Sequence, residues 1–299
     1  MDKWDKTYEY ELPKMKKTVS LVLGSGGARG LAHIGIIKWL EDNDYEIKSI
    51  SGCSMGALVG GFYAAGKLDK YVEWLESLDT LGMLKLLDFK GSGGLVSGDK
   101  LIAKLTEIIG DYKIEELDVK FTAVATNIEL EKEVWINSGS LMSAIRASIS
   151  LPLFFTPYKH NKNVLVDGGV LNPVPIAPTM GDDTELTISV NLGGEVCPDS
   201  VVKRENKKDK KITTKIKEYM EKVSLPDTFT KEDGMYIVAN KSIETMQGTI
   251  ARMKLAAYPP DIEINIPRNI CGTFDFTLSK ELIEYGYKKC EESFLEQES

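Results

Sequence analysis

The stretch TVSLVLGSGGARG, from Thr18 to Gly30, begins as a β-branched, apolar run and ends in a turn rich in glycine. A short apolar run that stops at glycine is typical of a buried strand. The residues that follow, LAHIGIIKWLEDN (31–43), place Leu31, Ile34, Ile37 and Leu40 near one face of a helix. The sequence therefore predicts a strand, a turn and a helix in immediate succession.

The same order of elements recurs in YEIKSISGCSMGALVGGFYAAG, from Tyr45 to Gly66. Residues 45–52 predict a strand, and residues 54–66 predict a helix of small residues that ends at Gly66. Two such units in succession are typical of a parallel sheet with right-handed crossovers. Further strands are predicted at 119–128, 163–167, 185–193 and 261–266, and further helices at 69–78, 99–110, 138–150, 242–257 and 279–296.

Neither an internal repeat nor a low-complexity linker is visible in the sequence, so we expect residues 18–299 to form a single domain. Residues 1–17 predict a polar extension. A basic segment is expected at 198–232, because its stretch 201–222 holds nine Lys and Arg against four Asp and Glu. We interpret this stretch as a solvated loop and helix, with a patch for lipid headgroups as the alternative.

The composition narrows the classes of function. The net charge of −8 and the pI of about 5.1 argue against a nucleic-acid partner, because such proteins usually present a basic face. The four cysteines are scattered and form no CxxC pair, so zinc and redox sites are not expected. Without an apolar signal segment or a run of about 18 apolar residues, we expect a soluble, cytoplasmic protein. Transient contact with a membrane surface stays open.

Ser54 lies at the centre of GCSMG, with Gly52 and Gly56 two residues away on either side. A nucleophilic serine on a sharp strand-to-helix turn needs glycine at these positions, where the backbone passes close to its neighbours. The amides at the start of the helix also favour negative charge near the hydroxyl. The alternative is a serine that only caps the helix.

The glycine turn GSGGARG (24–30) fails two familiar phosphate-binding patterns. A dinucleotide fingerprint needs Gly or Ala where Arg29 stands, and a P-loop needs Lys after its last glycine, where Leu31 stands. What remains is a tight turn, or a set of amides at a helix start that faces a phosphate or an oxyanion. Both loops should lie at the carboxyl edge of adjacent strands, where α/β sheets place their ligands.

Three residues are candidates for the base that would accept the serine proton. His33 lies one turn into its helix and is interpreted as a packed or surface residue. His160, in YKHNKNV, is interpreted as an exposed residue of a hairpin turn. Asp167 ends an apolar strand and points toward the same sheet edge as the two loops, although Asp-Gly is also a common turn pair. Neither histidine fits the residue order of an α/β-hydrolase triad.

Three motifs in fixed order, GSGGARG (24–30), GCSMG (52–56) and DGG (167–169), resemble the patatin-like phospholipase family. The similarity continues in AIRASISLP (144–152) and VDGGVLNPVP (166–175), and it covers roughly residues 18–194. The resemblance implies a three-layer α/β/α sandwich around a mainly parallel sheet. It also implies a Ser–Asp dyad without histidine, with Ser54 as nucleophile and Asp167 as base. The implied oxyanion-hole donors are the amides of Gly26, Gly27, Ala28 and Arg29.

In one position the glycine loop departs from the family, which usually has three successive glycines where this chain starts with Ser25. The function that the resemblance implies is hydrolysis of lipid carboxylic esters by an acyl-enzyme, with a lipid or acyl ester as substrate and with neither cofactor nor metal. A thioesterase, another esterase and a non-catalytic lipid-binding protein are the alternatives. The apolar stretch LDTLGMLKLLDF (78–89) is interpreted as core, with a cover over the site as the alternative.

Overall fold

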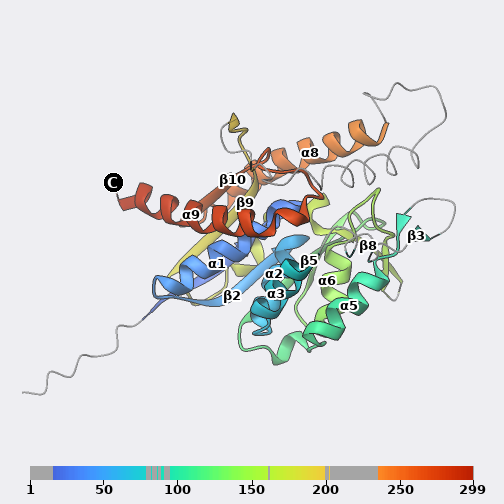
Figure 1. Cartoon of the computed structure of the whole chain (residues 1–299), viewed down its shortest axis with the longest axis horizontal. Coiled ribbons are helices and arrows are strands. Elements are labelled where there is room, and N and C mark those ends of the chain that lie inside the picture. The colour runs from blue at the N-terminus through green and yellow to red at the C-terminus, as the bar shows by residue number, and fades with distance from the viewer. Residues whose placement is uncertain are drawn as a thin grey trace, which may run out of the picture.

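The computed structural model describes residues 16–78, 82, 86, 89–90, 95–160, 162–198, 202 and 235–298 (Figure 1). Nearly all of the predicted extension and of the basic segment, and most of the stretch 78–89, therefore lie outside the described residues. The helices are α1 (Ala32–Asp42), α2 (Met55–Ala64), α3 (Leu68–Ser77), α5 (Asp99–Ile109), α6 (Leu141–Ser148), α8 (Met235–Ala257) and α9 (Ser279–Glu298). The strands are β1 (Lys17–Leu23), β2 (Tyr45–Cys53), β3 (Phe89–Lys90), β4 (Leu95–Val96), β5 (Lys120–Asn127), β6 (Lys132–Ile136), β7 (Tyr158–His160), β8 (Asn163–Asp167), β9 (Leu186–Gly194) and β10 (Ile262–Pro267).

The central sheet has eight strands in the order β10-β9-β1-β2-β5-β8-β7, and β6 pairs with β5. The five strands from β10 to β5 run parallel, whereas β6, β7 and β8 form the antiparallel end. A parallel core agrees with the repeated strand–turn–helix order of the sequence. The mainly parallel sheet with flanking helices confirms the predicted fold class.

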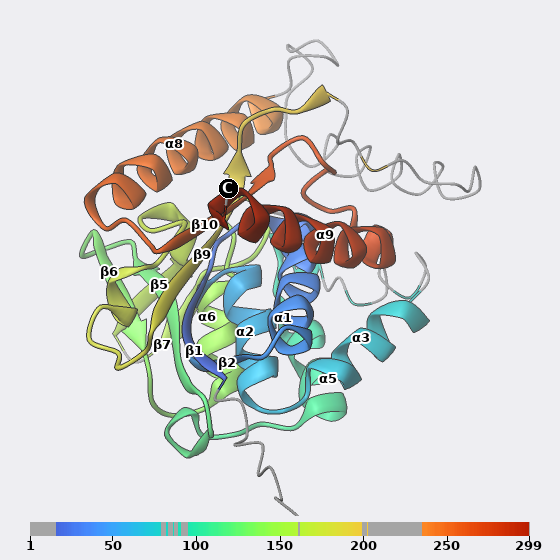
Figure 2. The same ribbon diagram turned by 90° about the vertical axis from the view of Figure 1, so that its left-hand side faces the viewer.

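Successive side chains of β1 point to opposite faces of the sheet, and each face has its own core. Val19, Leu21 and Leu23 of β1 face the main core under α1, α2 and α9. Val22 faces the opposite side, where it packs with residues of α8 and of the segment that follows β8. Figure 2 shows α8 on one side of the sheet and α1 and α2 on the other. The period of two along β1 therefore produces the three layers.

One edge of β5 brings two distant chain segments together. Parallel β2 pairs with the first half of this edge and ends with Cys53 opposite Val124. Antiparallel β8 pairs with the second half and ends with Asp167 opposite Ala125. Because β6 occupies the other edge of β5, β2 and β8 lie on the same edge and their carboxyl ends meet. On the far side of β2, parallel pairing of Leu23 with Gly52 brings the glycine loop to this point.

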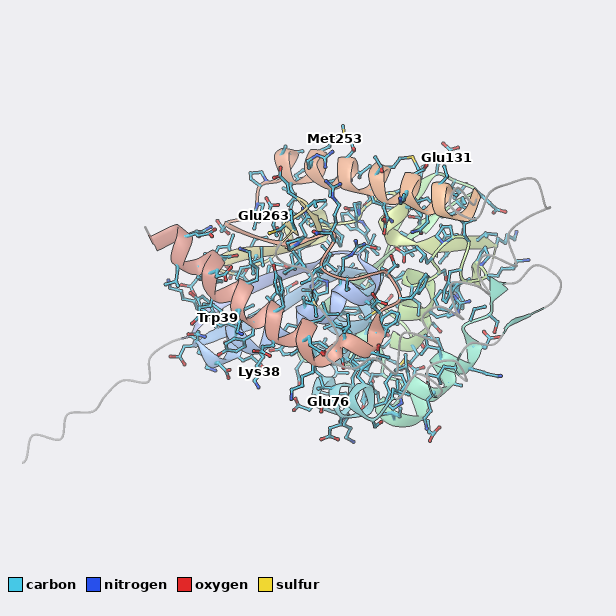
Figure 3. All side chains as sticks on the ribbon, turned by 45° about the horizontal axis from the view of Figure 1, so that its top comes forward. Lys38, Trp39, Glu76, Glu131, Met253 and Glu263 are labelled. Carbon is cyan, nitrogen blue, oxygen red and sulfur yellow. The ribbon has the colours of Figure 1, made fainter. Side chains whose placement is uncertain are left out.

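Most of the predicted elements are present, but the short strands β3, β4 and β7 were not predicted, and there are three further differences. The helix after the glycine turn starts as a 3₁₀ turn, η1 (Gly27–Leu31), before α1. The helix α8 begins at Met235, earlier than the predicted 242. The β5–β6 hairpin was not predicted, and its turn contains Glu131 with a φ of 53°. In Figure 3, Glu131 lies near Met253 of α8, on the side of the molecule away from Lys38 and Glu76. None of the described helices is long and apolar enough to cross a membrane.

Close packing of α1 against α9 depends on two glycines. A Cβ on Gly35 would overlap the carbonyl oxygen of Ile283 in α9, and a Cβ on Gly286 would overlap the carbonyl of Ala32 in α1. Each glycine therefore permits the backbone of the partner helix to approach. Without them the main core could not close on this side.

We predict that Gly35→Ala destabilises the protein by about 1–3 kcal/mol, because overpacking outweighs the gain of about 1 kcal/mol in helix propensity. Gly181→Ala is the control, since a Cβ there meets no atom within 4 Å. Urea denaturation of both variants measures the effect. An unchanged urea midpoint for Gly35→Ala would show that α1 and α9 can move apart with little loss of stability.

Candidate active site

Ser54 occupies a strained turn between β2 and α2. Its φ of 54° and ψ of −124° lie in a region that residues other than glycine rarely adopt. A Cβ on Gly52 would lie 2.5 Å from the backbone of Gly56, and a Cβ on Gly56 would overlap the carbonyl of Leu23. Glycine is therefore required on both sides of the turn. The geometry is that of a nucleophile elbow, with Ser54 only 8% exposed.

A buried hydroxyl holds this turn in place. The Ser54 amide donates to Ser148 Oγ at 2.9 Å, and the Ser148 hydroxyl donates to the carbonyl of Val124 at 2.6 Å. Ser148 ends α6 and is fully buried. The strained residue is thus tied to β5 through a helix that is distant in sequence. The sequence analysis did not predict this role, because it considered Ser148 only as part of the motif AIRASISLP.

Asp167 is completely buried at the end of β8. Its Oδ1 accepts from the Gly169 amide at 2.7 Å, and its Oδ2 has no hydrogen-bond partner. Burial raises the pKa of the carboxyl from 3.8 to about 6, whereas the nearby Ser54 hydroxyl and the Gly169 amide act in the lowering direction. The hydroxyl therefore lies close to the carboxyl without completing a hydrogen bond to Oδ2. The two predicted dyad residues share one site.

Gly168 and Cys53 also lie next to the Asp167 carboxyl. A Cβ on Gly168 would overlap the carbonyl of Val124, so only glycine permits the chain to turn here. Cys53, next to Ser54, is buried and its Sγ contacts the carbonyl of Pro173 at 3.3 Å. Burial raises the pKa of this thiol well above its usual value. A protonated, enclosed thiol is a poor nucleophile, so Ser54 is the better candidate.

Two amides of the glycine loop have no hydrogen-bond partner among the described residues. Its first two amides are engaged, since Gly24 donates to Val190 and Ser25 donates to Pro173. The Ala28 amide donates to the carbonyl of Thr273 at 2.9 Å, which corrects the expectation that it is a free donor. The amides of Gly26 and Gly27 make no hydrogen bond within the described part of the chain. Gly27 has a φ of 57°, which suits glycine.

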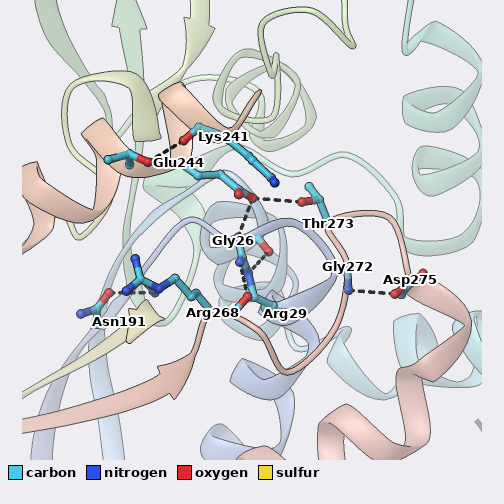
Figure 4. Close-up of polar contacts among 11 residues, drawn as sticks. Gly26, Arg29, Asn191, Lys241, Glu244, Arg268, Gly272, Thr273 and Asp275 are labelled. Carbon is cyan, nitrogen blue, oxygen red and sulfur yellow. Dashed lines mark hydrogen bonds and ion pairs between the residues drawn. The ribbon is translucent and has the colours of Figure 1, made fainter. Parts of the chain in front are cut away.

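The side chain of Arg29 holds the glycine loop in place through hydrogen bonds. Its guanidinium donates to the carbonyl of Gly26 at 3.0 Å, to the carbonyl of Arg268 at 2.7 Å and to Glu244 at 3.4 Å (Figure 4). Glu244, on α8, also accepts from the Thr273 hydroxyl at 3.2 Å. Arg29 is nearly buried. These bonds connect the glycine loop to α8 and to the segment after β10, which is a structural role.

Neither histidine is placed as a base for Ser54. His33 is fully buried, and its Nε2 donates to the carbonyl of Gly24 at 2.9 Å. Burial lowers its pKa to about 4, so the ring is neutral at pH 7. His160 is exposed at the end of β7, in the β7–β8 hairpin. The predicted packed and exposed positions are both confirmed.

An apolar cavity of about 120 Å³ opens beside Ser54. Ser54, Gly27 and Thr273 provide its polar end, and Leu86 is the only lining residue from the stretch 78–89 among the described residues. The rest of the lining is aliphatic or aromatic: Met55, Leu58, Tyr71, Trp74, Leu75, Leu101, Leu105, Ile149, Leu151, Phe154, Phe155, Phe274 and Phe276. The cavity suits a hydrocarbon chain whose polar end reaches the serine. No metal-ligating cluster of three or more residues occurs in the described ranges.

The chain is similar to several known proteins. A family model described as patatin-like phospholipase matches residues 21–180. An uncharacterized NTE family protein of Mycobacterium bovis is 33% identical over 319 residues, which cover 90% of this chain and 89% of the relative. The lysophospholipase NTE1 of Kluyveromyces lactis is 33% identical over 185 residues, covering 59% of this chain and 13% of that protein. Among solved structures, VipD from Legionella pneumophila aligns with a TM-score of 0.46 and 14% identity, over 95% of this chain and 67% of that one.

We predict that Ser148→Ala destabilises the fold by about 1–3 kcal/mol, because it leaves the buried Ser54 amide without an acceptor. Faster hydrogen exchange at that amide should accompany the loss. Ser143→Ala, which removes a half-buried hydroxyl from the same helix, is the matched control. Equal stabilities for the two variants would mean that Ser148 does not hold the turn.

Proposed function

Because the chain belongs to the patatin-like phospholipase family, we propose that it is a serine acyl hydrolase that cleaves lipid carboxylic esters. The proposal rests on one arrangement: Ser54 lines the polar end of an apolar cavity, and the buried Asp167 carboxyl lies next to this serine. The cavity would hold the acyl chain, and the ester carbonyl would face the serine. Phospholipids and lysophospholipids are the proposed substrates, in line with the lysophospholipase names of some relatives.

In the proposed first step, the Ser54 hydroxyl attacks the ester carbonyl while its proton passes to Asp167. A carboxylate with a pKa of about 6 is mostly ionised at pH 7, and it is a better base than an exposed aspartate. Its free Oδ2 is the atom that would receive the proton. Collapse of the tetrahedral intermediate expels the alcohol, which takes the proton from Asp167. The acyl group then remains bound to Ser54.

The amides of Gly26 and Gly27 are the proposed oxyanion donors. Both belong to the glycine loop, and Gly27 also lines the apolar cavity next to Ser54. Loss of one such donor typically costs about 3–4 kcal/mol of transition-state stabilisation. Since Arg29 and the Ala28 amide hold the loop in place, these donors need no rearrangement during the reaction. In the second step, Asp167 would activate a water that attacks the acyl-enzyme, and the fatty acid leaves.

Two other functions use the same residues. A thioesterase would place an acyl thioester in the same cavity, and a lipid-binding protein would use the cavity without chemistry. A panel of p-nitrophenyl esters, lysophospholipids, phospholipids and acyl thioesters separates the enzymes by kcat/KM. Labelling of Ser54 by a fluorophosphonate probe separates an active serine from a binding protein.

We predict that Ser54→Ala and Asp167→Asn each lower hydrolysis by at least about 1,000-fold, because each removes an essential group from the dyad. His160→Asn should retain wild-type activity, since the ring is exposed in a hairpin. Initial rates on a p-nitrophenyl ester, with circular dichroism to confirm folding, measure both effects. If His160→Asn folds but is inactive, the site must use a triad that includes His160 and not a Ser–Asp dyad.

We also predict that kcat/KM rises with pH through about 6 and becomes constant above about pH 7. The pKa of Asp167 is raised by burial to about 6, and only the ionised carboxylate can accept the serine proton. An ordinary histidine base would titrate at a similar pH, so the profile is measured in His160→Asn as well. A flat profile from pH 5 to 8, or one that changes in this variant, would exclude Asp167 as the base.

A further inference from the structure

Tyr71 is a buried polar residue of the apolar cavity that the proposed mechanism does not use. Its side chain lines the cavity, and the residue is only 3% exposed. The hydroxyl forms no hydrogen bond with any residue that the structure describes. A buried phenol usually has a hydrogen-bond partner, because an unpaired hydroxyl that is removed from water is unfavourable.

Other tyrosines show the usual arrangement. The hydroxyls of Tyr63, Tyr112 and Tyr287 donate to protein oxygens at distances of 3.0, 3.2 and 3.2 Å. All three residues are more exposed than Tyr71 and could hydrogen-bond to solvent instead. A structural hydrogen bond therefore does not explain why a tyrosine stands at position 71. Its hydroxyl is available to a ligand that enters the cavity.

Tyr71 lies at the end of the cavity that is remote from the nucleophile. The helix α3 follows α2 after residues 65–67, and α5 packs against α3 (Figure 2). The Tyr71 ring contacts Phe62 of α2 edge to face, with the ring centroids 5.0 Å apart. Phe62 stands eight residues after Ser54, which corresponds to about 12 Å along the helix axis. A chain attached to Ser54 must cover roughly this distance to reach the phenol.

The surroundings of the Tyr71 hydroxyl favour a neutral partner. The described residues that line the cavity include no charged side chain. Burial raises the pKa of the phenol above its usual value, so the group is neutral near pH 7. A neutral phenol can both donate and accept a hydrogen bond, as can an aliphatic hydroxyl. A charged group on the ligand would lose its hydration here without gaining an opposite charge.

We infer that Tyr71 selects an acyl chain that carries a hydroxyl group, and that it hydrogen-bonds to this group at the far end of the apolar cavity. The inference rests on the proposed ester hydrolysis. An extended chain advances by roughly 1.2 Å per bond, so the distance from Ser54 corresponds to about ten bonds. An unsubstituted chain would cover the phenol with methylene groups and leave it unpaired. The preferred substrate class is therefore a hydroxyacyl ester whose hydroxyl lies near the tenth carbon.

The test compares two esters that differ only in this hydroxyl: p-nitrophenyl 10-hydroxydecanoate and p-nitrophenyl decanoate. The readout is the ratio of kcat/KM for the hydroxyacyl ester to that for the plain ester. We expect Tyr71→Phe to lower this ratio about 5-fold, the usual effect of losing one neutral hydrogen bond. Since the Tyr71 hydroxyl has no partner in the protein, the variant should keep its urea midpoint. Tyr63→Phe, which removes a hydroxyl outside the cavity lining, is the matched control and should not change the ratio.

The position of the hydroxyl provides a second control. In p-nitrophenyl 3-hydroxydecanoate the hydroxyl lies close to the ester and is too far from Tyr71 for a hydrogen bond. The ratio of kcat/KM for this ester to that for the decanoate should therefore be the same in Tyr71→Phe and in the wild type. An unchanged ratio for the 10-hydroxy ester in Tyr71→Phe, or an equal fall for the 3-hydroxy ester, would overturn the inference.

Direct binding separates this inference from the proposed hydrolysis. Calorimetry should give a Kd for 10-hydroxydecanoic acid that rises about 5-fold in Tyr71→Phe, whereas the Kd for decanoic acid should not rise. If the wild type cleaves none of the esters but shows this difference in binding, the proposed hydrolysis is wrong and the selectivity of the cavity stands. If the esters are cleaved and both acids bind equally to the two proteins, hydrolysis stands and the role of Tyr71 is wrong.

Discussion

The meeting of two strand ends on one edge of β5 is the constraint on which the rest of the site depends. Along this edge, β2 pairs with the residues of β5 up to Val124, and β8 pairs with the residues of β5 from Ala125 onward. Since β8 runs antiparallel to β5, its carboxyl end comes to the point where β2 also ends. A slip of one residue in either pairing would turn the side chain at that end to the other face of the sheet.

Around this junction the chain contains several unfavourable features, and hydrogen bonds stabilise each of them. The strained φ of Ser54 is held through Ser148 on α6, and the buried Asp167 carboxylate is held by one amide. The glycine loop is held by Arg29, whose acceptors include the Arg268 carbonyl and Glu244 on α8. Two helices, α6 and α8, and the segments after β8 and β10 therefore each restrain a different part of the site.

Local sequence patterns could predict the parallel half of the sheet and the edge at which the loops meet. The repeated strand–turn–helix order carries that information, and Gly52 and Gly56 mark the elbow around Ser54. Family motifs were needed to select Asp167 over the histidines. The contacts of Ser148, the engagement of the Ala28 amide and the β5–β6 hairpin could not be predicted, because they depend on pairing between segments far apart in the chain. Periodicity describes which face is buried and not which distant partner covers it.

The buried carboxylate has a consequence for the folded state as a whole. An unfolded chain would ionise Asp167 near pH 3.8, whereas the folded protein does so near 6. Between these two values the unfolded form loses the proton more easily, so the contribution of Asp167 to conformational stability declines as pH rises, by about 3 kcal/mol at most. Above pH 6 the penalty stays constant. For Asp167 alone, the folded state is thus most favoured in acid, where the proposed base is protonated, whereas the buried neutral His33, with its pKa lowered to about 4, acts in the opposite direction over much of the same pH range.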